Sequence, residues 1–277
     1  MPGFTSRDDI INELTTNGKA DLFNFYKVGT AAQAAGVWHS LWKGAGQPGA
    51  GSDPAATPGT VYDSDATSPV AGSMFFPDRS TDQRYVLSFG AVATTNCTLM
   101  LYDRLAGVSG ISTASTGAKT VSSGALTRYS STAATLNECW LEVTTATTTT
   151  APVVNLSSYT SADGTTAQTG PNLTFPAAAT VAGAMLQVPL SASKQGIRSV
   201  EAGLTVGTAS AAGAVNVMII RPLARIPLLA NVWNEVSFLD DTLGLPRVFD
   251  NANLGLAYLA SATTATTFWG TVSCAYG

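Results

Sequence analysis

The stretches TLMLYDRL at residues 98–105 and NVMIIRPL at residues 216–223 decide the fold class, and the rest of the chain is arranged around them. Each follows a second matching stretch, AGSMFFP at 71–77 in the first case and AGAMLQVP at 182–189 in the second, across a polar interval. The interval is longer in the second case, and surface loops tolerate extra residues of this kind well. The sequence therefore predicts one β unit that is stated twice.

This duplication divides the chain into three parts. Residues 61–160 are the first predicted β unit, residues 173–277 the second, and residues 1–60 an N-terminal arm with a Gly/Pro linker. Short apolar runs recur about every 8–15 residues and are separated by Gly, Asn and Pro, as in antiparallel sandwiches and jelly rolls. We expect an all-β fold of two tandem, duplicated antiparallel β-sandwich or jelly-roll-like units, with Met74 superposing on Met185, and an arm that contains one short helix.

The composition limits the classes of partner. The 277 residues carry a net charge of −4, and their 14 Lys and Arg are scattered, which argues against a nucleic-acid binder. The sequence has no run of about 18 apolar residues, and Arg7, Asp8 and Asp9 lie where a signal peptide would have its apolar core, so we expect no membrane partner. Only 12% of the residues are charged, which indicates that much of the surface faces other subunits.

The arm has the clearest helix signal of the chain at residues 5–16. Thr5 or Ser6 can cap this helix, Asp8 and Asp9 favour its N-terminus, and Asn17-Gly18 ends it. A helix this short is marginal alone, so it must dock on its own body or on a neighbour.

The arm is also rich in aromatic residues, which are costly to leave in water. Residues 22–28 and 36–42 read as short strands or extended segments, and the Gly- and Pro-rich residues 44–60 read as a linker that gives the arm reach. We therefore predict that the arm attaches the protein to a neighbouring subunit through nine side chains: Phe4, Ile10, Ile11, Leu14, Phe23, Phe25, Tyr26, Trp38 and Trp42.

No residue pattern in the sequence is typical of catalysis. His39 is the sole histidine and stands between Trp38 and Trp42, which favours packing over a role as a base. The thiols of Cys97, Cys139 and Cys274 lie far apart and are expected to be buried and reduced. We predict that the protein is not an enzyme and that it has no catalytic, cofactor-binding or metal-binding residues.

Five parts of the sequence carry a resemblance to a known family. They are PGFTSRDDIINELTTNGK at 2–19, WHSLW at 38–42 with GAGQP at 44–48, LYDRL at 101–105 with SGI at 109–111, KQGIRSV at 194–200, and IRPL at 220–223. These stretches resemble virion structural proteins of tailed bacteriophages. A major capsid protein would need a long spine helix, and helical periodicity is confined to the first 16 residues or so.

The resemblance implies a part of the virion but not which part, and among β-rich virion proteins the capsid decoration (cement) proteins and the tail proteins remain. We favour a capsid decoration protein that binds the outside of the shell and clamps neighbouring capsomers. Its expected partners are the major capsid protein and other copies of itself, with a trimer as one candidate state. Its expected location is the capsid surface of the virion, after synthesis in the host cytoplasm.

Two other functions stay open from the sequence. One is a tail or tail-fibre-associated structural protein. The other is a glycan-binding β-sandwich on the virion, which would need exposed aromatic rings grouped with acid or amide side chains. Trp140, Trp233 and Trp269 instead fall at or beside predicted strands, so we expect them in cores.

Overall fold

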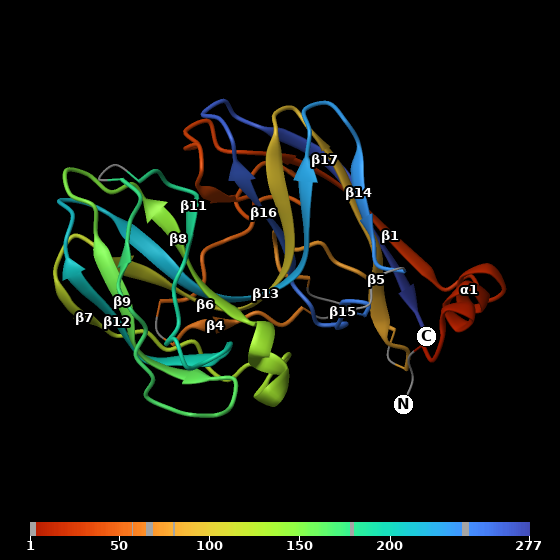
Figure 1. Ribbon diagram of the computed structural model, residues 1–277, viewed down its shortest axis with the longest axis horizontal. Coiled ribbons are helices and arrows are strands. Elements are labelled where there is room, and N and C mark those ends of the chain that lie inside the picture. Colours follow the sequence, from red (N-terminus) through yellow and green to blue (C-terminus); the bar gives the residue numbers. More distant parts are fainter. Residues whose placement is uncertain (1–3, 57, 65–68, 80, 178–179, 240–243) are drawn as a thin grey trace.

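Most of the regular secondary structure of the chain is antiparallel β-strand, as the sequence predicts. The computed structural model describes residues 4–56, 58–64, 69–79, 81–177, 180–239 and 244–277. Three sheets lie in a row: a central barrel has one sheet on each side, and the helix stands at the far end of one of them (Figure 1).

The central sheet closes on itself as a six-stranded barrel, because the sixth strand pairs back onto the first. In order around the barrel the strands are β13 (Ala214–Leu228), β8 (Glu138–Thr145), β11 (Ala184–Gln187), β2 (Trp38–Ser40), β16 (Leu254–Ala260) and β6 (Cys97–Ser112). The short β4 (Thr60–Val61) pairs with β6 outside this ring.

The two flanking sheets are named here after one strand of each. The β5 sheet consists of β14 (Asn234–Ser237), β5 (Arg84–Ala93), β17 (Thr267–Tyr276), β1 (Ala20–Val28) and β3 (Gly46–Gln47) in that order, with β15 (Arg247–Val248) also on β5. The β9 sheet consists of β10 (Leu173–Thr174), β9 (Val153–Ser161), β12 (Ile197–Thr208) and β7 (Gly117–Lys119). A 3₁₀ helix, η1 (Ser131–Leu136), precedes β8.

The long strands β6 and β13 join the three sheets into one body. They pair along nearly their whole length, from Ala214 beside Ser112 to Leu228 beside Cys97. One end of this pair packs against the β5 sheet and the other end against the β9 sheet, while side chains on the opposite face, such as Met100, point into the barrel. Because β6 and β13 each contribute side chains to all three cores, the three sheets share these two strands.

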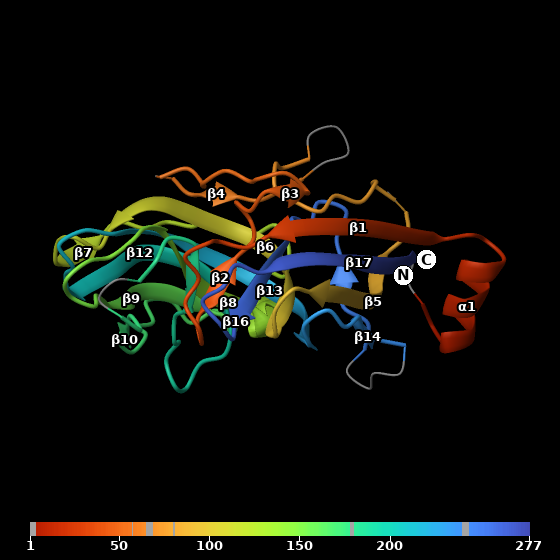
Figure 2. The same cartoon turned by 90° about the horizontal axis from the view of Figure 1, so that it is seen from above.

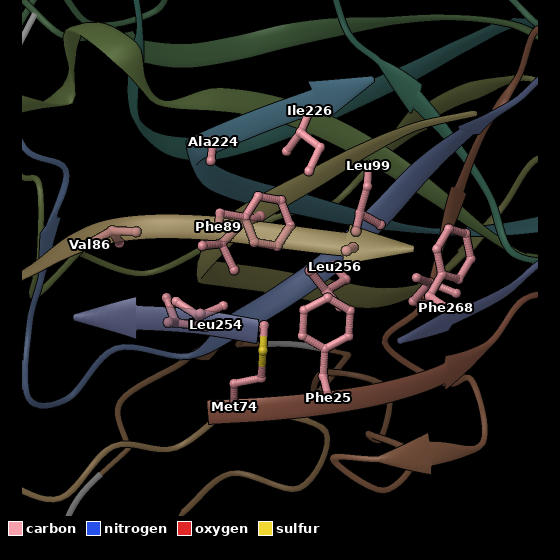
Figure 3. Packing of buried hydrophobic residues seen from close by; sticks show 14 of the residues in the cluster. Phe25, Met74, Val86, Phe89, Leu99, Ala224, Ile226, Leu254, Leu256 and Phe268 are labelled. Carbon is pink, nitrogen blue, oxygen red and sulfur yellow. The ribbon is translucent and has the colours of Figure 1, made fainter. Parts of the chain in front are cut away.

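Three apolar cores result. The first lies between the β5 sheet and the barrel, where Phe89 of β5 and Phe25 of β1 meet Ile226 of β13 and Leu256 of β16 (Figure 3). The second lies between the β9 sheet and the barrel, and Leu156 of β9 lies in it. The third fills the barrel with bulky side chains: Met100, Tyr102, Trp140, Met185, Met218, Ile220 and Ala257.

The expected tandem units over 61–160 and 173–277 are not confirmed, because strands from the two ranges pair with each other throughout. Met74 and Met185 do not occupy matching places. Met74 lies outside the named strands, bridges to Leu254 and packs in the first core, whereas Met185 lies in β11 inside the barrel. The similarity of the two sequence blocks reflects strands that face the same barrel interior, since Met100 and Met218 both point into it.

The arm predicted over residues 1–60 does contain the expected helix. Helix α1 (Arg7–Thr15) is capped by Ser6, whose Oγ accepts a hydrogen bond from the backbone N–H of Asp9 at 3.1 Å. The carboxylate of Asp9 in turn accepts a hydrogen bond from the backbone N–H of Thr5 at 3.0 Å. The first hydrogen bond satisfies a donor that a helix start otherwise leaves free, and the second fixes the residue before the cap, which explains why the helix begins here.

The rest of the predicted arm belongs to the body and does not extend from it. Strand β1 pairs with β17 along its full length, from Ala20 beside Ala275 to Val28 beside Thr267. Strand β2 is one of the barrel strands and pairs with β11 and β16. The physical reason is that aromatic residues of the predicted arm, such as Phe25, pack in the first core. Without them, apolar side chains of that core would be exposed to water. Figure 2 shows β1 and β17 running side by side, with α1 beyond their ends.

Candidate binding surface

The nine side chains predicted for attachment are mostly used inside the protein. Ile10, Phe25 and Trp42 are buried, Phe4, Leu14, Phe23 and Trp38 are partly buried, and only Ile11 and Tyr26 are exposed. The structure therefore does not bring the nine together as one surface.

The helix and its preceding residues cover one end of the β5 sheet. Ile10 packs on Leu87 and Ala275, and the ring of Phe4 lies 5.6 Å from the ring of Tyr85. Ile11, the next residue along, points to solvent with 49% of its surface exposed. Docking against the sheet thus stabilises a helix that would be marginal alone.

Trp38 and Trp42 contact other aromatic or charged side chains of the body. The Trp42 ring lies 4.7 Å from the guanidinium carbon of Arg104, a cation–π contact in which Tyr62 takes part from another side at 4.9 Å. The Trp38 ring meets Trp140 edge to face at 6.0 Å. Both tryptophans are structural.

The charged residues of the TLMLYDRL stretch are buried and paired. Nε and Nη2 of Arg128 each donate to a carboxylate oxygen of Asp103 at 2.8 Å. Arg104 lies 3.3 Å from Glu142, whose carboxylate also accepts a hydrogen bond from the Asn216 amide at 3.1 Å. Burial raises the pKa of Glu142, but Arg104 and these hydrogen bonds outweigh it and hold that pKa below its usual value. Charges at a strand centre are stable here because each has a partner.

The outer face of the β5 sheet, turned away from the barrel, carries three exposed aromatic rings. Tyr26 of β1 is 39% exposed, Trp269 of β17 is 44% exposed, and their rings lie 5.5 Å apart across the two paired strands. Trp233, just before β14, is 48% exposed. Its indole lies over Gly90 of β5, so closely that a methyl group at Gly90 would come within 2.6 Å of the ring. We call these three rings the aromatic row.

The expectation that Trp233 and Trp269 lie in cores is therefore wrong. The sequence did hold a signal for Trp269: in β17, Phe268, Val272 and Cys274 are buried, so strand alternation turns Trp269 outward. Phe268 and Trp269 are neighbours, and one of the two had to face solvent. No comparable signal existed for Trp233, which lies outside a strand.

A groove runs along the underside of the barrel beside η1. Two cavities of about 610 Å³ and 400 Å³ share Leu136, Pro222 and Leu223 as lining residues. Leu136 is 62% exposed. Four basic side chains also line the two cavities: Lys194, Arg221, Arg225 and Arg247. Lys194 is paired with Asp163 at 2.7 Å and Arg225 with Glu138 at 3.1 Å, and Glu138 itself lines the first cavity. We call this feature the η1 groove; it combines apolar contact area with the guanidinium groups of Arg221 and Arg247.

The residues considered for catalysis have structural environments. His39 is buried, its Nε2 accepts a hydrogen bond from the backbone N–H of Ala34 at 3.0 Å, and burial lowers its pKa, so the ring stays neutral. The three cysteines are buried and unbonded, as predicted, and burial raises the pKa of the Cys97 and Cys139 thiols to about 12. Such thiols are poor nucleophiles.

Within the described part of the chain, no three His, Cys, Asp or Glu side chains are grouped so that they could hold a metal ion. A search of the helices over the same residues found none that is long and apolar enough to cross a membrane.

Comparison with known proteins found no family model, no curated protein and no solved structure that matches this chain.

Proposed function

We propose that the protein is a structural component of a tailed-bacteriophage virion, and specifically a decoration protein that binds the outside of the capsid shell. The observation that carries the proposal is the character of the surface. Only 12% of residues are charged, while eight large apolar side chains are exposed among the described residues. A protein held permanently in an assembly tolerates such a surface better than one that must stay soluble alone. The sequence stretches that resemble tailed-phage virion proteins support the same class.

The surface best suited to contact the shell is the η1 groove. Most aromatic residues of the N-terminal segment are occupied internally, so they cannot also serve as anchors on a neighbour. The groove offers Leu136 and Leu223 as apolar contacts and Arg221 as a cation. It is suited to an extended, apolar segment of the major capsid protein with acidic flanks. Other copies of the chain, in a trimer for example, would then occupy neighbouring positions on the capsid surface.

A tail location is the second candidate, because the closed barrel is also the kind of unit from which tail-tube rings are built. Cryo-electron microscopy of the intact particle distinguishes the two. We expect density that fits the three-sheet body on the outside of the head. Density in the tail would replace the decoration proposal by the tail proposal, and particles that lack the protein altogether would contradict both.

Binding to the shell can be tested with single substitutions. Deleting residues 1–43 would also remove β1 and β2, and therefore parts of two sheets. We expect Leu136→Asp to weaken binding to particles that lack the protein by at least tenfold, as measured by co-sedimentation. Ile11→Asp, at an exposed apolar position on the helix, is the matched variant and should bind like the unaltered protein. If Ile11→Asp alone loses binding, attachment runs through the helix, as the sequence first indicated.

A further inference from the structure

The aromatic row has a geometry that packing alone does not explain. Tyr26, Trp269 and Trp233 come from three separate segments and lie across the strands of the β5 sheet. Tyr26 and Trp269 contact each other, Trp233 contacts β5 at Gly90, and each of the three residues is still 39–48% exposed. Exposed aromatic residues scattered singly need no explanation, but a row on one sheet face is a candidate binding site.

The orientation of Trp233 is fixed before any ligand arrives. Its indole lies on the backbone of β5 at Gly90, where any side chain would displace it. Its ring N–H donates to the carboxylate of Glu235 at 3.4 Å. A ring held from below and from one edge loses little conformational entropy when it binds a ligand, which favours affinity.

A line of polar side chains runs beside the aromatic row. Asn24 of β1 is paired with Thr271 of β17, which is paired with Gly90 of β5, which is paired with Glu235 of β14. Strand alternation puts Asn24 on the same face as Tyr26, and Thr271 on the same face as Trp269. An amide and a hydroxyl therefore follow the rings at a spacing of one strand, about 4.8 Å. The Glu235 carboxylate lies two strands beyond Thr271, because Gly90 between them has no side chain.

The size and charge of this face restrict its ligand. The three rings, together with Leu22 on the same face, offer roughly 400 Å² of apolar surface, whereas a stable protein interface buries about 800 Å² per partner. Glu235 is the one charged side chain in the register rows of Asn24 and Tyr26 that the structure describes. The face is thus too small for a second protein and lacks the cations that an anionic polymer would require.

We infer that this face is a binding site for a neutral saccharide chain. A pyranose ring has a face of C–H groups that packs on an aromatic ring, and hydroxyl groups around its edge that hydrogen-bond to amide, hydroxyl and carboxylate groups. The aromatic row supplies the first kind of contact, and Asn24, Thr271 and Glu235 supply the second. This site is separate from the η1 groove, so it does not depend on the proposed attachment to a capsid.

The test uses the full-length protein and four defined hexasaccharides: cellohexaose, maltohexaose, chitohexaose and the anionic hexagalacturonate. Binding is measured by isothermal titration calorimetry and by tryptophan fluorescence, because two of the three rings are indoles. We expect at least one neutral probe to bind saturably with a change in fluorescence, and hexagalacturonate to bind at least tenfold more weakly. Failure of all three neutral probes to bind, or equal binding of hexagalacturonate, would overturn the inference.

Substitutions assign the binding to this face. Trp269→Ala and Trp233→Ala should each weaken saccharide binding at least tenfold, and Gly90→Ala should weaken this binding by displacing the Trp233 ring. Leu229→Ala, also at an exposed apolar position, is the control and should bind like the unaltered protein. Unchanged thermal melting of each variant would show that the fold is intact. If Trp269→Ala instead abolishes a concentration-dependent dimer seen by sedimentation, the face is an interface between copies and the saccharide inference is wrong.

Discussion

The two flanking sheets differ on the faces that they turn to solvent. The outer face of the β5 sheet carries Leu22, Tyr26 and Trp269, whereas the outer face of the β9 sheet carries small polar side chains such as Asn155 and Thr205. Their inner faces are alike, since both pack apolar side chains on the barrel.

This difference separates what folding requires from what it does not. The β9 sheet demonstrates that a sheet on this barrel is complete with a polar outer face. The large apolar side chains on the β5 sheet therefore add nothing that the architecture needs, and water contact makes them unfavourable. Such a face indicates a surface with a binding role. If so, the two sheets should respond alike to substitutions on their inner faces and differently to substitutions on their outer faces.

The largest effect is expected where the sheets are alike. Phe89 and Leu156 lie on the inner faces of the β5 and β9 sheets, and neither has solvent-exposed surface. Phe89→Ala and Leu156→Ala should each lower the free energy of unfolding by about 3–5 kcal/mol, through lost burial and a new cavity. Urea denaturation measures both. A loss below about 1 kcal/mol for either residue would mean that its sheet is not held by its inner face.

A smaller effect is expected where α1 covers the end of the β5 sheet. Ile10 packs on Leu87 and Ala275, while its neighbour Ile11 is exposed. Ile10→Ala should cost about 2 kcal/mol, and Ile11→Ala should change stability by no more than about 0.5 kcal/mol. The two variants carry the same chemical change, so equal losses in thermal or urea unfolding would argue against the docked helix.

The next effect is a pH dependence of folding stability that comes from Lys27 in β1. Lys27 follows Tyr26 but points to the opposite side, where it is buried and donates to the carbonyl oxygen of Gly44 at 2.9 Å. Burial lowers its pKa from 10.5 to about 8. Between these values the unfolded chain binds more protons than the folded one, so this group makes folding more favourable as the pH rises.

The measurement compares the unaltered protein with Lys27→Met between pH 7 and 10. The buried thiols act in the opposite direction. Their pKa values are raised in the folded protein, so at high pH the unfolded chain loses thiol protons that the folded chain keeps, and folding becomes less favourable as the pH rises. They are common to both proteins and cancel in the difference. The unaltered protein should therefore gain stability relative to Lys27→Met above about pH 8, and a constant difference would contradict the buried position.

The smallest effect compares matched cross-strand pairs on the two outer faces. Tyr26 and Trp269 are direct neighbours on β1 and β17, and Asn155 and Thr205 are direct neighbours on β9 and β12. Double-mutant cycles to alanine should give a coupling of about 0.5–1 kcal/mol for the aromatic pair and about 0.2 kcal/mol for the polar pair. Equal couplings would remove the proposed distinction between the faces.

Local features of the chain were predictable because they depend on neighbouring residues. Ser6 and Asp9 mark the start of α1 through hydrogen bonds within one turn, and the all-β class follows from short apolar runs between turn residues. Met100 and Met218 both point into the barrel, but the duplication that their sequence stretches predicted is not confirmed.

Strand partners were not predictable in the same way. Nothing in residues 20–28 specifies pairing with residues 267–276, so the β1 segment was read as part of an arm. The same limit hid the aromatic row, because Tyr26, Trp233 and Trp269 become neighbours only through that pairing and the loop before β14. Contacts between distant segments depend on how all the apolar sheet faces of the protein pack against one another, and no local sequence pattern contains this information.

The pairing of β1 with β17 has a consequence for how the protein is made. On the ribosome β1 is completed long before its partner β17 is synthesised. At roughly 5–20 residues per second, the interval is on the order of 10 to 50 s. During that time Phe23 and Phe25 have no sheet to join, and contacts so far apart in sequence form slowly. A nascent chain of this kind would benefit from a chaperone that shields β1 until translation ends.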